Sequence, residues 1–330
     1  MPLRVIVFTR YGNPDVLELR ELEKPTPEDD DVLIRVRAAA LNPLDWHIMR
    51  GLPYILRMQY GLLKPKSGRL GVDFAGTVEA VGKNVTQFRP GEDVFGARNG
   101  AFAEYVCTQG KALAAKPANL TFEQAAAVPV AGFTALQGLR DKGRLQPGQG
   151  VLINGASGGV GTFAVQLAKV FGAEVTGVCS TKNLEMVRSL GADHVIDYTQ
   201  EDFTRSGQRY DLLVDCVGNH PLSACRRVIS SSGTYVMVGG SLLRLVTAGV
   251  LSRFVRQSLV SFIASPNAAD LVYMKELIEA EKLTPVIDRC YTLDEAPEAM
   301  RYLAEGHARG KVVLTVNGNT KSQPDSTRSR

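Results

Sequence analysis

The residues best suited to chemistry form a run of small side chains, Asn154-Gly155-Ala156-Ser157-Gly158-Gly159-Val160-Gly161. The apolar run at 151–154 is typical of a strand buried in a parallel sheet. An amphipathic helix is expected after the glycines, because Phe163, Leu167 and Phe171 recur on one face. A pyrophosphate must approach the backbone closely, and a helix N-terminus offers it free N–H groups and a partial positive charge.

The run matches the dinucleotide-binding fingerprint, with Ala156 at the position of the first glycine. Gly161 is expected to let the helix pack closely on the strand. A tight turn alone does not explain five small residues in succession at 155–159. We therefore predict a dinucleotide site in which the contacts come from Ser157, Gly158, Gly159 and Val160.

The end of the next predicted strand indicates which dinucleotide binds. An NAD site needs an Asp or Glu roughly 20 residues after the glycines, to bind the ribose 2′-hydroxyl. The stretch 178–183 has no acid and offers Ser180 and Lys182 instead, which suit a 2′-phosphate. NADPH is therefore predicted over NADH, although Lys182 taken alone also fits an ordinary solvated lysine.

Composition bounds the class of protein. The chain has 330 residues, of which 38 are basic and 34 acidic, and 45% are hydrophobic. At roughly 150 residues per domain this length predicts about two domains, and the composition excludes wholesale disorder. The net charge of +4 is small and dispersed, without a basic block, so no nucleic-acid partner is expected.

Cysteine usage and hydropathy bear on the compartment. The cysteines are odd in number and far apart, with no CxxC pair: Cys107, Cys179, Cys216, Cys225 and Cys290. Neither a disulfide framework nor a structural zinc cluster is supported, and the pattern is typical of a reduced, cytoplasmic protein. The sequence lacks a signal h-region and any run of 18 uncharged apolar residues, so no membrane span is expected.

The predicted elements change in character near residue 121. Before it, β-rich runs separated by turn residues indicate a barrel or sandwich. After it, helical stretches at 122–128 and 133–139 lead into alternating strands and helices, typical of a doubly wound sheet. Asn267 predicts a helix start, and Asp294 is expected to cap the helix that Gly306 ends. The predicted strands are 5–8, 32–36, 73–81, 93–95, 151–154, 174–178, 210–216, 234–238 and 311–316.

Several short motifs follow one another in order. They are Ala40-Leu41-Asn42-Pro43-Leu44-Asp45, Gly71-Val72-Asp73-Phe74-Ala75-Gly76, Phe88-Arg89-Pro90-Gly91-Glu92-Asp93-Val94, Ala131-Gly132-Phe133-Thr134-Ala135-Leu136, the glycine run, Leu190-Gly191-Ala192-Asp193 and Gly310-Lys311-Val312-Val313-Leu314. In this order and spacing the chain resembles the zinc-independent quinone oxidoreductase (zeta-crystallin-like) branch of the medium-chain dehydrogenase/reductase superfamily. The likeness covers about residues 3–316.

The resemblance implies an α/β protein with a GroES-like β-barrel domain and a Rossmann domain built on a doubly wound parallel sheet. The barrel domain is expected at 1–125, completed by about 287–316, and the NADPH-binding Rossmann domain at 126–286. The cofactor would lie in the cleft between them. The polar tail, 317–330, is expected to be disordered.

The resemblance also implies a site without a metal. Matching the motifs places Asn42, Val72 and Ala131 where zinc-dependent relatives hold their catalytic zinc, and none of these side chains is a suitable zinc ligand there. Without a Lewis acid, the substrate must already be electrophilic, such as a quinone, an enone or an activated aldehyde.

Further cofactor contacts follow from the resemblance. It places the Asn42 amide beside the nicotinamide carboxamide and Thr134 beside the nicotinamide. The alternatives are a turn residue before Pro43 and a helix-start cap, respectively. The remaining expected contacts are Tyr198, Val217, Gly239, Gly240 and Lys311, of which Lys311 could instead be solvated.

Hydride delivery to a carbonyl or enone must be followed by a proton. His47 is a candidate donor because an imidazole titrates near neutral pH, and Tyr54 could donate a proton or stack on a quinone. Asp45 is expected in the cleft. A merely structural or exposed position is the alternative for His47, and a structural role is the alternative for Asp45.

These observations predict an NADPH-dependent, zinc-independent oxidoreductase that passes hydride to a quinone or an α,β-unsaturated carbonyl. The alternatives are an NAD(P)-dependent alcohol or aldehyde dehydrogenase on the same scaffold, and a non-catalytic NADPH-binding regulatory protein. A homodimer is expected from the family. The apolar segment 242–260 fits a substrate pocket, a dimer surface or a membrane-facing surface equally well, and 57–69 fits either a loop at the cleft mouth or a solvated loop.

Overall fold

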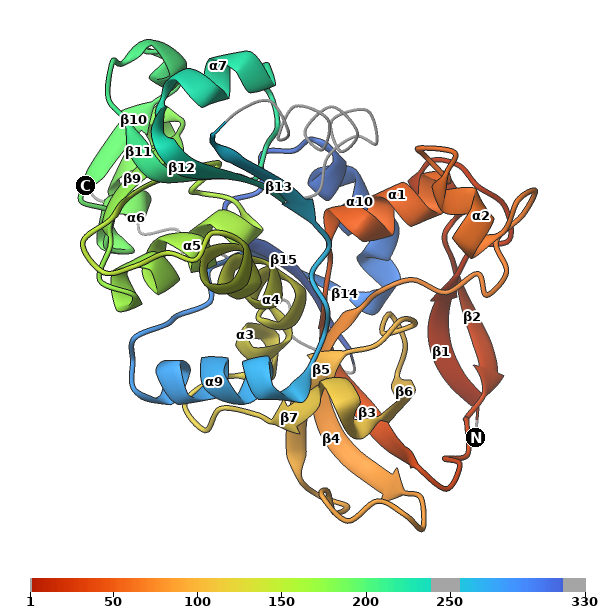
Figure 1. The fold of residues 1–330 in the computed structure, drawn as a ribbon. Helices are drawn as coiled ribbons and strands as arrows, with labels where there is room; N and C mark the ends of the chain where they lie inside the picture. The colour runs from red at the N-terminus through yellow and green to blue at the C-terminus, as the bar shows by residue number, and fades with distance from the viewer. Residues whose placement is uncertain (1, 239–255, 317–330) are drawn as a thin grey trace, which may run out of the picture.

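The structure, a computed structural model, describes residues 2–238 and 256–316. Figure 1 shows a parallel sheet with its helices on the left and antiparallel strands at the lower right. The predictions for Gly239, Gly240, most of the segment 242–260 and the tail 317–330 lie outside the described residues, so they remain predictions.

A six-stranded parallel sheet forms the nucleotide-binding half. Its order is β10-β9-β8-β11-β12-β13, which is the doubly wound arrangement predicted from the sequence. From β8 the chain adds β9 and β10 on one side and then crosses over to add β11, β12 and β13 on the other. This change of direction between β8 and β11 opens a crevice at the carboxyl ends of the strands. The strands are β8 (Gly150–Asn154), β9 (Glu174–Cys179), β10 (His194–Asp197), β11 (Tyr210–Asp215), β12 (Ile229–Val238) and β13 (Ser258–Phe262).

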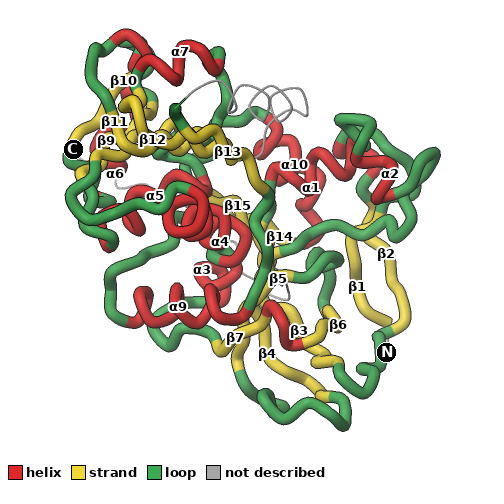
Figure 2. Tube along the Cα trace, viewed as in Figure 1, coloured by secondary structure: helices red, strands yellow, loops and turns green. Residues whose placement is uncertain are grey.

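Helices flank this sheet, as the tube in Figure 2 shows. They are α4 (Pro129–Gln137), α5 (Gly159–Val170), α6 (Leu184–Ser189) and α7 (Leu222–Arg227). Helix α9 (Ala268–Glu279) packs on α4, whereas α3 (Phe122–Ala126) packs on strands of the second half. The predicted start of α9 is confirmed, because the Asn267 side chain accepts a hydrogen bond from the Asp270 N–H. The predicted start at Phe133 was wrong: α4 begins at Pro129, since a proline at the first helical position needs no N–H partner.

The second half is an antiparallel-rich sheet with a separate two-stranded ribbon. Its main path runs β14-β15-β3-β4-β5-β7, with β6 paired to β3, and β1 pairs with β2 in the ribbon. The strands are β1 (Pro2–Val7), β2 (Glu18–Glu23), β3 (Asp31–Ala40), β4 (Asp73–Val81), β5 (Asp93–Ala97), β6 (Tyr105–Gln109), β7 (Leu113–Ala115), β14 (Ile287–Thr292) and β15 (Lys311–Thr315). The chain thus returns to this half after the parallel sheet, because β15 pairs antiparallel with β3.

The helices of this half are α1 (Pro43–Arg50), α2 (Leu56–Tyr60) and α10 (Ala296–Ala304). The predicted cap at Asp294 was wrong: Thr292 and Glu295 form a capping box around a 3₁₀ turn that contains Asp294. Strand β2 was not predicted, because its leucines are flanked by charged residues and its side chains are mostly exposed. Shorter helical turns are Pro14–Val16, Gly110–Ala112, Gly138–Lys142, Thr181–Asn183, Phe203–Arg205 and Leu293–Glu295.

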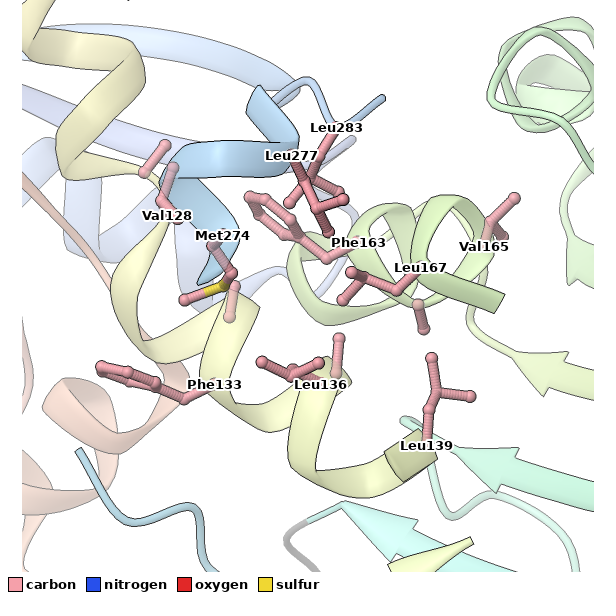
Figure 3. Close-up of a cluster of buried hydrophobic side chains, with 14 of the residues drawn as sticks. Val128, Phe133, Leu136, Leu139, Phe163, Val165, Leu167, Met274, Leu277 and Leu283 are labelled. Atoms are coloured by element: carbon pink, nitrogen blue, oxygen red, sulfur yellow. The ribbon is translucent and has the colours of Figure 1, made fainter. Parts of the chain in front are cut away.

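The largest hydrophobic core continues from one half into the other. It includes Ala75 of β4 and Phe95 of β5 together with the buried faces of α4, α5 and α9. Figure 3 shows Met274 of α9 directed at α4, with Phe163 of α5 beside Leu277. Gly132 makes this approach possible, because a Cβ there would lie 2.3 Å from the Met274 sulfur. The core therefore fixes the two halves against each other.

Candidate active site

The glycine loop follows β8 at the crevice edge and leads directly into α5. Gly155 has φ +84°, which favours glycine, and a Cβ on Gly161 would lie 2.0 Å from the Gly155 carbonyl oxygen. The prediction that Gly161 allows the helix to pack closely is therefore confirmed. The first N–H groups of α5, at Gly159, Val160 and Gly161, have no carbonyl one turn earlier to accept from them, so they can bind an anion.

A buried carboxylate fixes the neighbouring turn at the end of β11. Oδ1 of Asp215 accepts hydrogen bonds from the N–H groups of Val217 and Gly218 and from the side chain of Asn154 (2.9 Å). Oδ2 accepts from the Tyr235 hydroxyl at 2.7 Å. This arrangement brings the exposed Val217 against the glycine loop, because a Cβ at Gly155 would lie 2.6 Å from Val217 Cγ2. Sequence reasoning missed Asp215, which nothing but its burial distinguishes.

The end of β9 carries a polar group that the sequence prediction also missed. The Asn183 amide donates to the hydroxyls of Ser157 (3.1 Å) and Ser180 (3.2 Å). Its carbonyl oxygen is buried and has no hydrogen-bond partner among the described residues. A buried acceptor without a donor is costly, so this oxygen is suited to a hydroxyl group of a bound molecule.

Three residues predicted to contact the cofactor lie near this end of the sheet and remain open to solvent. Lys182 is exposed in the turn after β9, and Tyr198, which follows β10, is half exposed. The Tyr198 N–H donates to the carbonyl of Cys179, so it lies beside the end of β9. The structure therefore places Ser180, Lys182 and Tyr198 around one edge, where they could face the adenosine end of a dinucleotide.

The final strand connects the glycine loop to the antiparallel half. Gly310 donates its N–H to the Ser157 carbonyl at 2.9 Å and pairs with Gly158. The stem of Lys311 passes close to α5, because a Cβ at Gly159 would lie 3.1 Å from Lys311 Cδ. Lys311 is only 4% exposed, so the alternative of a solvated lysine was wrong.

The Lys311 ammonium enters a buried polar cluster with Asn42 and Asp73. It donates to Asn42 Oδ1 at 2.6 Å and pairs with Asp73 Oδ2 at 3.1 Å, while the Asn42 amide donates to the same Asp73 oxygen at 3.0 Å. The other Asp73 oxygen accepts from the N–H of Val130 in the first turn of α4. Burial raises the pKa of Asp73, and the Lys311 charge and these hydrogen bonds oppose the increase. Asp73 was another residue that the sequence prediction did not include.

Thr134 lies one turn along α4 from this contact. Its hydroxyl donates to the Val130 carbonyl at 2.6 Å, and the side chain is buried. Thr134 is inside α4, so the alternative of a helix-start cap was wrong. Because Val130 is bonded to Asp73, the structure brings Asn42, Thr134 and Lys311 to one region beside the glycine loop.

Asp45 lies beneath this cluster and supports the backbone. Its carboxylate accepts the N–H groups of Asn42 (2.8 Å) and Gly71 (3.1 Å), which fixes the start of α1. Burial raises the pKa of Asp45 to about 7, and the two N–H donors oppose the increase. With both oxygens bonded to the backbone, the geometry favours the structural alternative for Asp45. Asn42 is the N-cap residue of α1, and its side chain bonds to Asp73 and Lys311 in the cluster. A structural role at the start of the helix and a position in the candidate site are therefore compatible for Asn42.

The two proposed proton donors lie at the surface. His47 is exposed in the last turn of α1, and its Nδ1 lies 3.1 Å from the Leu52 carbonyl oxygen. Tyr54 is 70% exposed, with the Arg57 guanidinium 4.8 Å from its ring centre. No hydrogen bond or ion pair given by the described residues connects either side chain to Asn42, Asp73 or Lys311, so their roles remain predictions.

These residues fit a dinucleotide. The close helix–strand contact at Gly161 holds the N–H groups of α5 at the crevice, and the Asn183 oxygen offers an unsatisfied acceptor for a ribose hydroxyl. The three positions that match the zinc ligands of zinc-dependent relatives hold the amide of Asn42 and the hydrocarbon side chains of Val72 and Ala131. Within the described ranges, no three His, Cys, Asp or Glu side chains group closely enough to hold a metal ion.

Two family descriptions match the chain. Residues 28–118 match the "Alcohol dehydrogenase GroES-like domain" and residues 190–314 match "Zinc-binding dehydrogenase". Together with the relatives below, they show that the chain belongs to the medium-chain dehydrogenase/reductase superfamily, in its quinone oxidoreductase branch. The predicted GroES-like domain and Rossmann domain are confirmed.

Relatives of similar length support this assignment. The chain is 33% identical over 328 residues to the chloroplastic quinone-oxidoreductase homolog of Spinacia oleracea, covering 94% of this chain and 98% of the relative. It is 34% identical to the NADPH-dependent alkenal/one oxidoreductase of Arabidopsis thaliana, covering 94% and 79%. The structure superposes on the quinone oxidoreductase from Coxiella burnetii with a TM-score of 0.86, at 32% identity, covering 96% and 100%.

The comparisons define the class of activity. The protein is an oxidoreductase that uses a nicotinamide cofactor and a small-molecule substrate. Across the residues that the structure describes, no helix combines the length and the apolar character needed to cross a bilayer.

Proposed function

We propose that the protein is an NADPH-dependent, zinc-independent oxidoreductase that reduces a quinone or an α,β-unsaturated carbonyl compound. One observation carries the proposal: the Lys311–Asn42–Asp73 cluster is buried directly beside the glycine loop, through Gly310 and the Lys311 stem. A polar cluster at this point is placed to orient the reactive end of a dinucleotide whose pyrophosphate rests on α5.

The residues of the chain bind and orient. The N–H groups of Gly159 and Val160 would hold the pyrophosphate, and Asn183 a ribose hydroxyl. Asn42 and Thr134 would bind the nicotinamide end, with Lys311 fixing the Asn42 carbonyl by its 2.6 Å hydrogen bond. NADPH, when bound, supplies the hydride. The protein contributes chiefly a fixed geometry and the exclusion of water from the crevice.

Protonation of the reduced product is assigned to His47, Tyr54 or solvent. The exposed positions of both side chains suit exchange of protons with water, and a substrate in the cleft would have to reach them. Asp45 is proposed to act only by fixing the backbone at Asn42 and Gly71.

Three features support NADPH and a metal-free reaction. The segment after β9 has no acid to bind a ribose 2′-hydroxyl and carries Ser180 and Lys182 at its exposed edge. The Arabidopsis relative is named as NADPH-dependent and as acting on alkenals and alkenones, an electrophilic class that needs no zinc. Asn42, Val72 and Ala131 offer no set of zinc donors.

Stopped-flow absorbance of NADPH tests the proposal, with a panel of quinones, enones, aldehydes and alcohols. We expect NADPH oxidation with quinones or enones, a preference for NADPH over NADH, and no zinc by metal analysis. Turnover of alcohols with NAD⁺ or NADP⁺ alone would instead establish the dehydrogenase alternative. Tight NADPH binding without turnover of any acceptor would establish the non-catalytic alternative.

Assembly and compartment remain proposals from the family resemblance. We propose a homodimer, which size-exclusion chromatography with light scattering would show as twice the 35.7 kDa chain mass. We also propose a cytoplasmic location, on the evidence of cysteine usage. The spinach relative is named as chloroplastic, so fractionation of the source cell is the relevant measurement.

A further inference from the structure

A basic cavity lies at the edge of the parallel sheet opposite the glycine loop. It has a volume of about 480 Å³ and is lined by four arginines, Arg209, Arg226, Arg227 and Arg256. Each of these residues precedes a strand of the sheet: β11 starts at Tyr210, β12 at Ile229 and β13 at Ser258. The glycine loop instead follows the carboxyl end of β8. A six-residue strand such as β11 spans about 20 Å, so the cavity is separate from the dinucleotide site.

None of the four arginines of the cavity forms an ion pair with a carboxylate of a described residue. Elsewhere in the protein, arginines pair with acids: Arg4 with Glu104, Arg140 with Asp270, and Arg205 with Asp202. Arg226 is half-buried and the other three arginines are exposed, so water and salt weaken their mutual repulsion, and a bound anion would remove it.

The nearest opposing charges offset only part of this positive charge. Asp211, at the start of β11, is not part of the lining and contributes at most one negative charge against four arginines, while it accepts hydrogen bonds from the Gly150 N–H and the Ser230 hydroxyl. The C-terminus of α7 carries about half a unit of negative charge at most, against two arginines in its last turn. The cavity therefore retains a strong net positive charge.

The cavity is also built on a buried support. Gln257 is buried, and its amide nitrogen donates to the carbonyls of Arg226 and Ile229 at 3.0 and 3.1 Å. Its amide oxygen accepts from Arg226 Nε at 2.8 Å, which fixes the direction of that guanidinium. The hydroxyls of Ser223 and Ser231 in the lining add neutral donors. Arginine forks combined with hydroxyl donors are the side chains that recognise phosphate oxygens.

We propose that this cavity is a second ligand site, which binds a small molecule carrying more than one phosphate group. The cavity is shallow and open to solvent, which suits a compact and strongly charged ligand, and four positive charges match a polyanion better than a single phosphate. A soluble phosphate compound and a phosphorylated lipid headgroup share this chemistry. The proposal does not depend on the proposed function, since it involves the opposite edge of the sheet.

Isothermal titration calorimetry with sodium tripolyphosphate tests the site, at 0.15 M salt and both with and without saturating NADPH. We expect one tripolyphosphate per chain, with an affinity that NADPH leaves unchanged. The variant Arg227→Gln/Arg256→Gln should bind at least tenfold more weakly. The control Arg20→Gln/Arg301→Gln removes the same charge from exposed ion pairs in the other half of the protein, and we expect less than a twofold change.

Sedimentation with vesicles distinguishes the two sources of phosphate. Binding to phosphatidylcholine vesicles that contain phosphatidylinositol 4,5-bisphosphate, absent with phosphatidylcholine alone and lost in Arg227→Gln/Arg256→Gln, would assign the site to a lipid headgroup. Tripolyphosphate binding without vesicle binding would assign it to a soluble compound. The proposal is overturned if neither probe binds, if NADPH displaces tripolyphosphate, or if the two double variants bind equally well.

Discussion

At the scale of single residues, Lys311 shows what sequence can and cannot establish. The local sequence around a lysine at the start of a strand does not indicate whether its side chain is solvated or buried. The structure buries it because β15 pairs between β14 and β3, which directs its stem toward α5 and its ammonium toward Asp73. The motif order predicted its place in the site, and only the tertiary contacts gave it a partner.

Replacing Lys311 with methionine should reveal how much the buried Asp73 carboxylate depends on the Lys311 charge for its stability. In Lys311→Met, the Asp73 carboxylate stays buried without its cation, so we expect the free energy of unfolding to fall by about 3–5 kcal/mol. Urea denaturation measures this change. Asp73→Asn/Lys311→Met removes the charge from both partners and should recover part of the loss. A single variant as stable as the native protein would contradict the ion pair.

Asp45 predicts a pH dependence of stability. Its pKa is about 7 in the folded protein against 3.8 ordinarily, so the folded state keeps a proton that the unfolded chain releases between these values. The stability contributed by this group is therefore full below about pH 4 and is lost as pH rises through 7. At about 1.4 kcal/mol per pH unit, the decrease approaches about 4 kcal/mol.

The variant Asp45→Asn isolates that contribution. Asparagine satisfies only one of the two N–H donors, so the variant should be less stable than the native protein at pH 4.5. Since asparagine does not ionise, its deficit should shrink as the pH rises to 7.5. Urea denaturation at both pH values gives the two deficits. A deficit that stays constant across this range would show that Asp45 does not titrate there.

The edge beside Asn183 determines the cofactor preference that we propose. Ser180→Asp/Lys182→Ala introduces the acid that binds a ribose 2′-hydroxyl and removes a cation for the 2′-phosphate. We expect the ratio of kcat/KM for NADPH to that for NADH to fall at least tenfold. Lys142→Ala, which removes a lysine from the turn after α4, serves as the charge control. An unchanged ratio in the double variant would place the 2′-phosphate elsewhere.

At the scale of elements, the strand–loop–helix unit from β8 to α5 was predictable, because local chemistry dictates it. A buried strand, small residues and an amphipathic helix each leave their own pattern at 151–171. The polar partners of this unit were not predictable. Asp215 ends β11 and Asn183 lies in the turn after β9, and both strands flank β8 in the sheet. Nothing in the local sequence around either residue indicates that the sheet brings both side chains to the same crevice.

Two glycines of the loop should respond differently to the same methyl group. In Gly161→Ala, the Cβ meets backbone atoms of Gly155 and Ala156 at 2.0–2.8 Å, so we expect a loss of at least about 2 kcal/mol in stability. Gly158 has φ −85°, and its Cβ would touch only the Gly155 oxygen, at 3.4 Å. Gly158→Ala should therefore keep its stability within about 1 kcal/mol and bind NADPH at least tenfold more weakly.

Thermal unfolding and NADPH fluorescence titration separate these two effects. The pair serves as its own control, since each variant adds one methyl group to the same loop. Normal NADPH affinity in Gly158→Ala would show that the phosphates do not approach the loop backbone. Normal stability in Gly161→Ala would contradict the close contact between α5 and the backbone of Gly155 and Ala156.

At the scale of the whole molecule, the sequence predicted two domains, because β-rich runs give way to alternating strands and helices near residue 121. The structure shows why a boundary drawn there does not separate independent bodies. Helices α3 and α4 follow that point, yet α3 packs on β3 and β4 while α4 packs on α5. The arginine cavity is likewise a product of assembly, because Arg209, Arg226 and Arg256 are distant in the chain and meet only when β11, β12 and β13 align.

A shared core predicts that both halves unfold together. Trp46, the only tryptophan, lies in α1 and reports on the antiparallel half, whereas far-UV circular dichroism reports on all helices. Leu167→Ala removes a buried side chain from α5, at a cost of about 2–5 kcal/mol. Since the core connects α5 to β4 and β5, the urea midpoint for Trp46 fluorescence should fall as far as the midpoint for circular dichroism. A Trp46 midpoint that stays at the native value would mean that the halves unfold independently, and that the contacts through α4 fix their positions without coupling their stabilities.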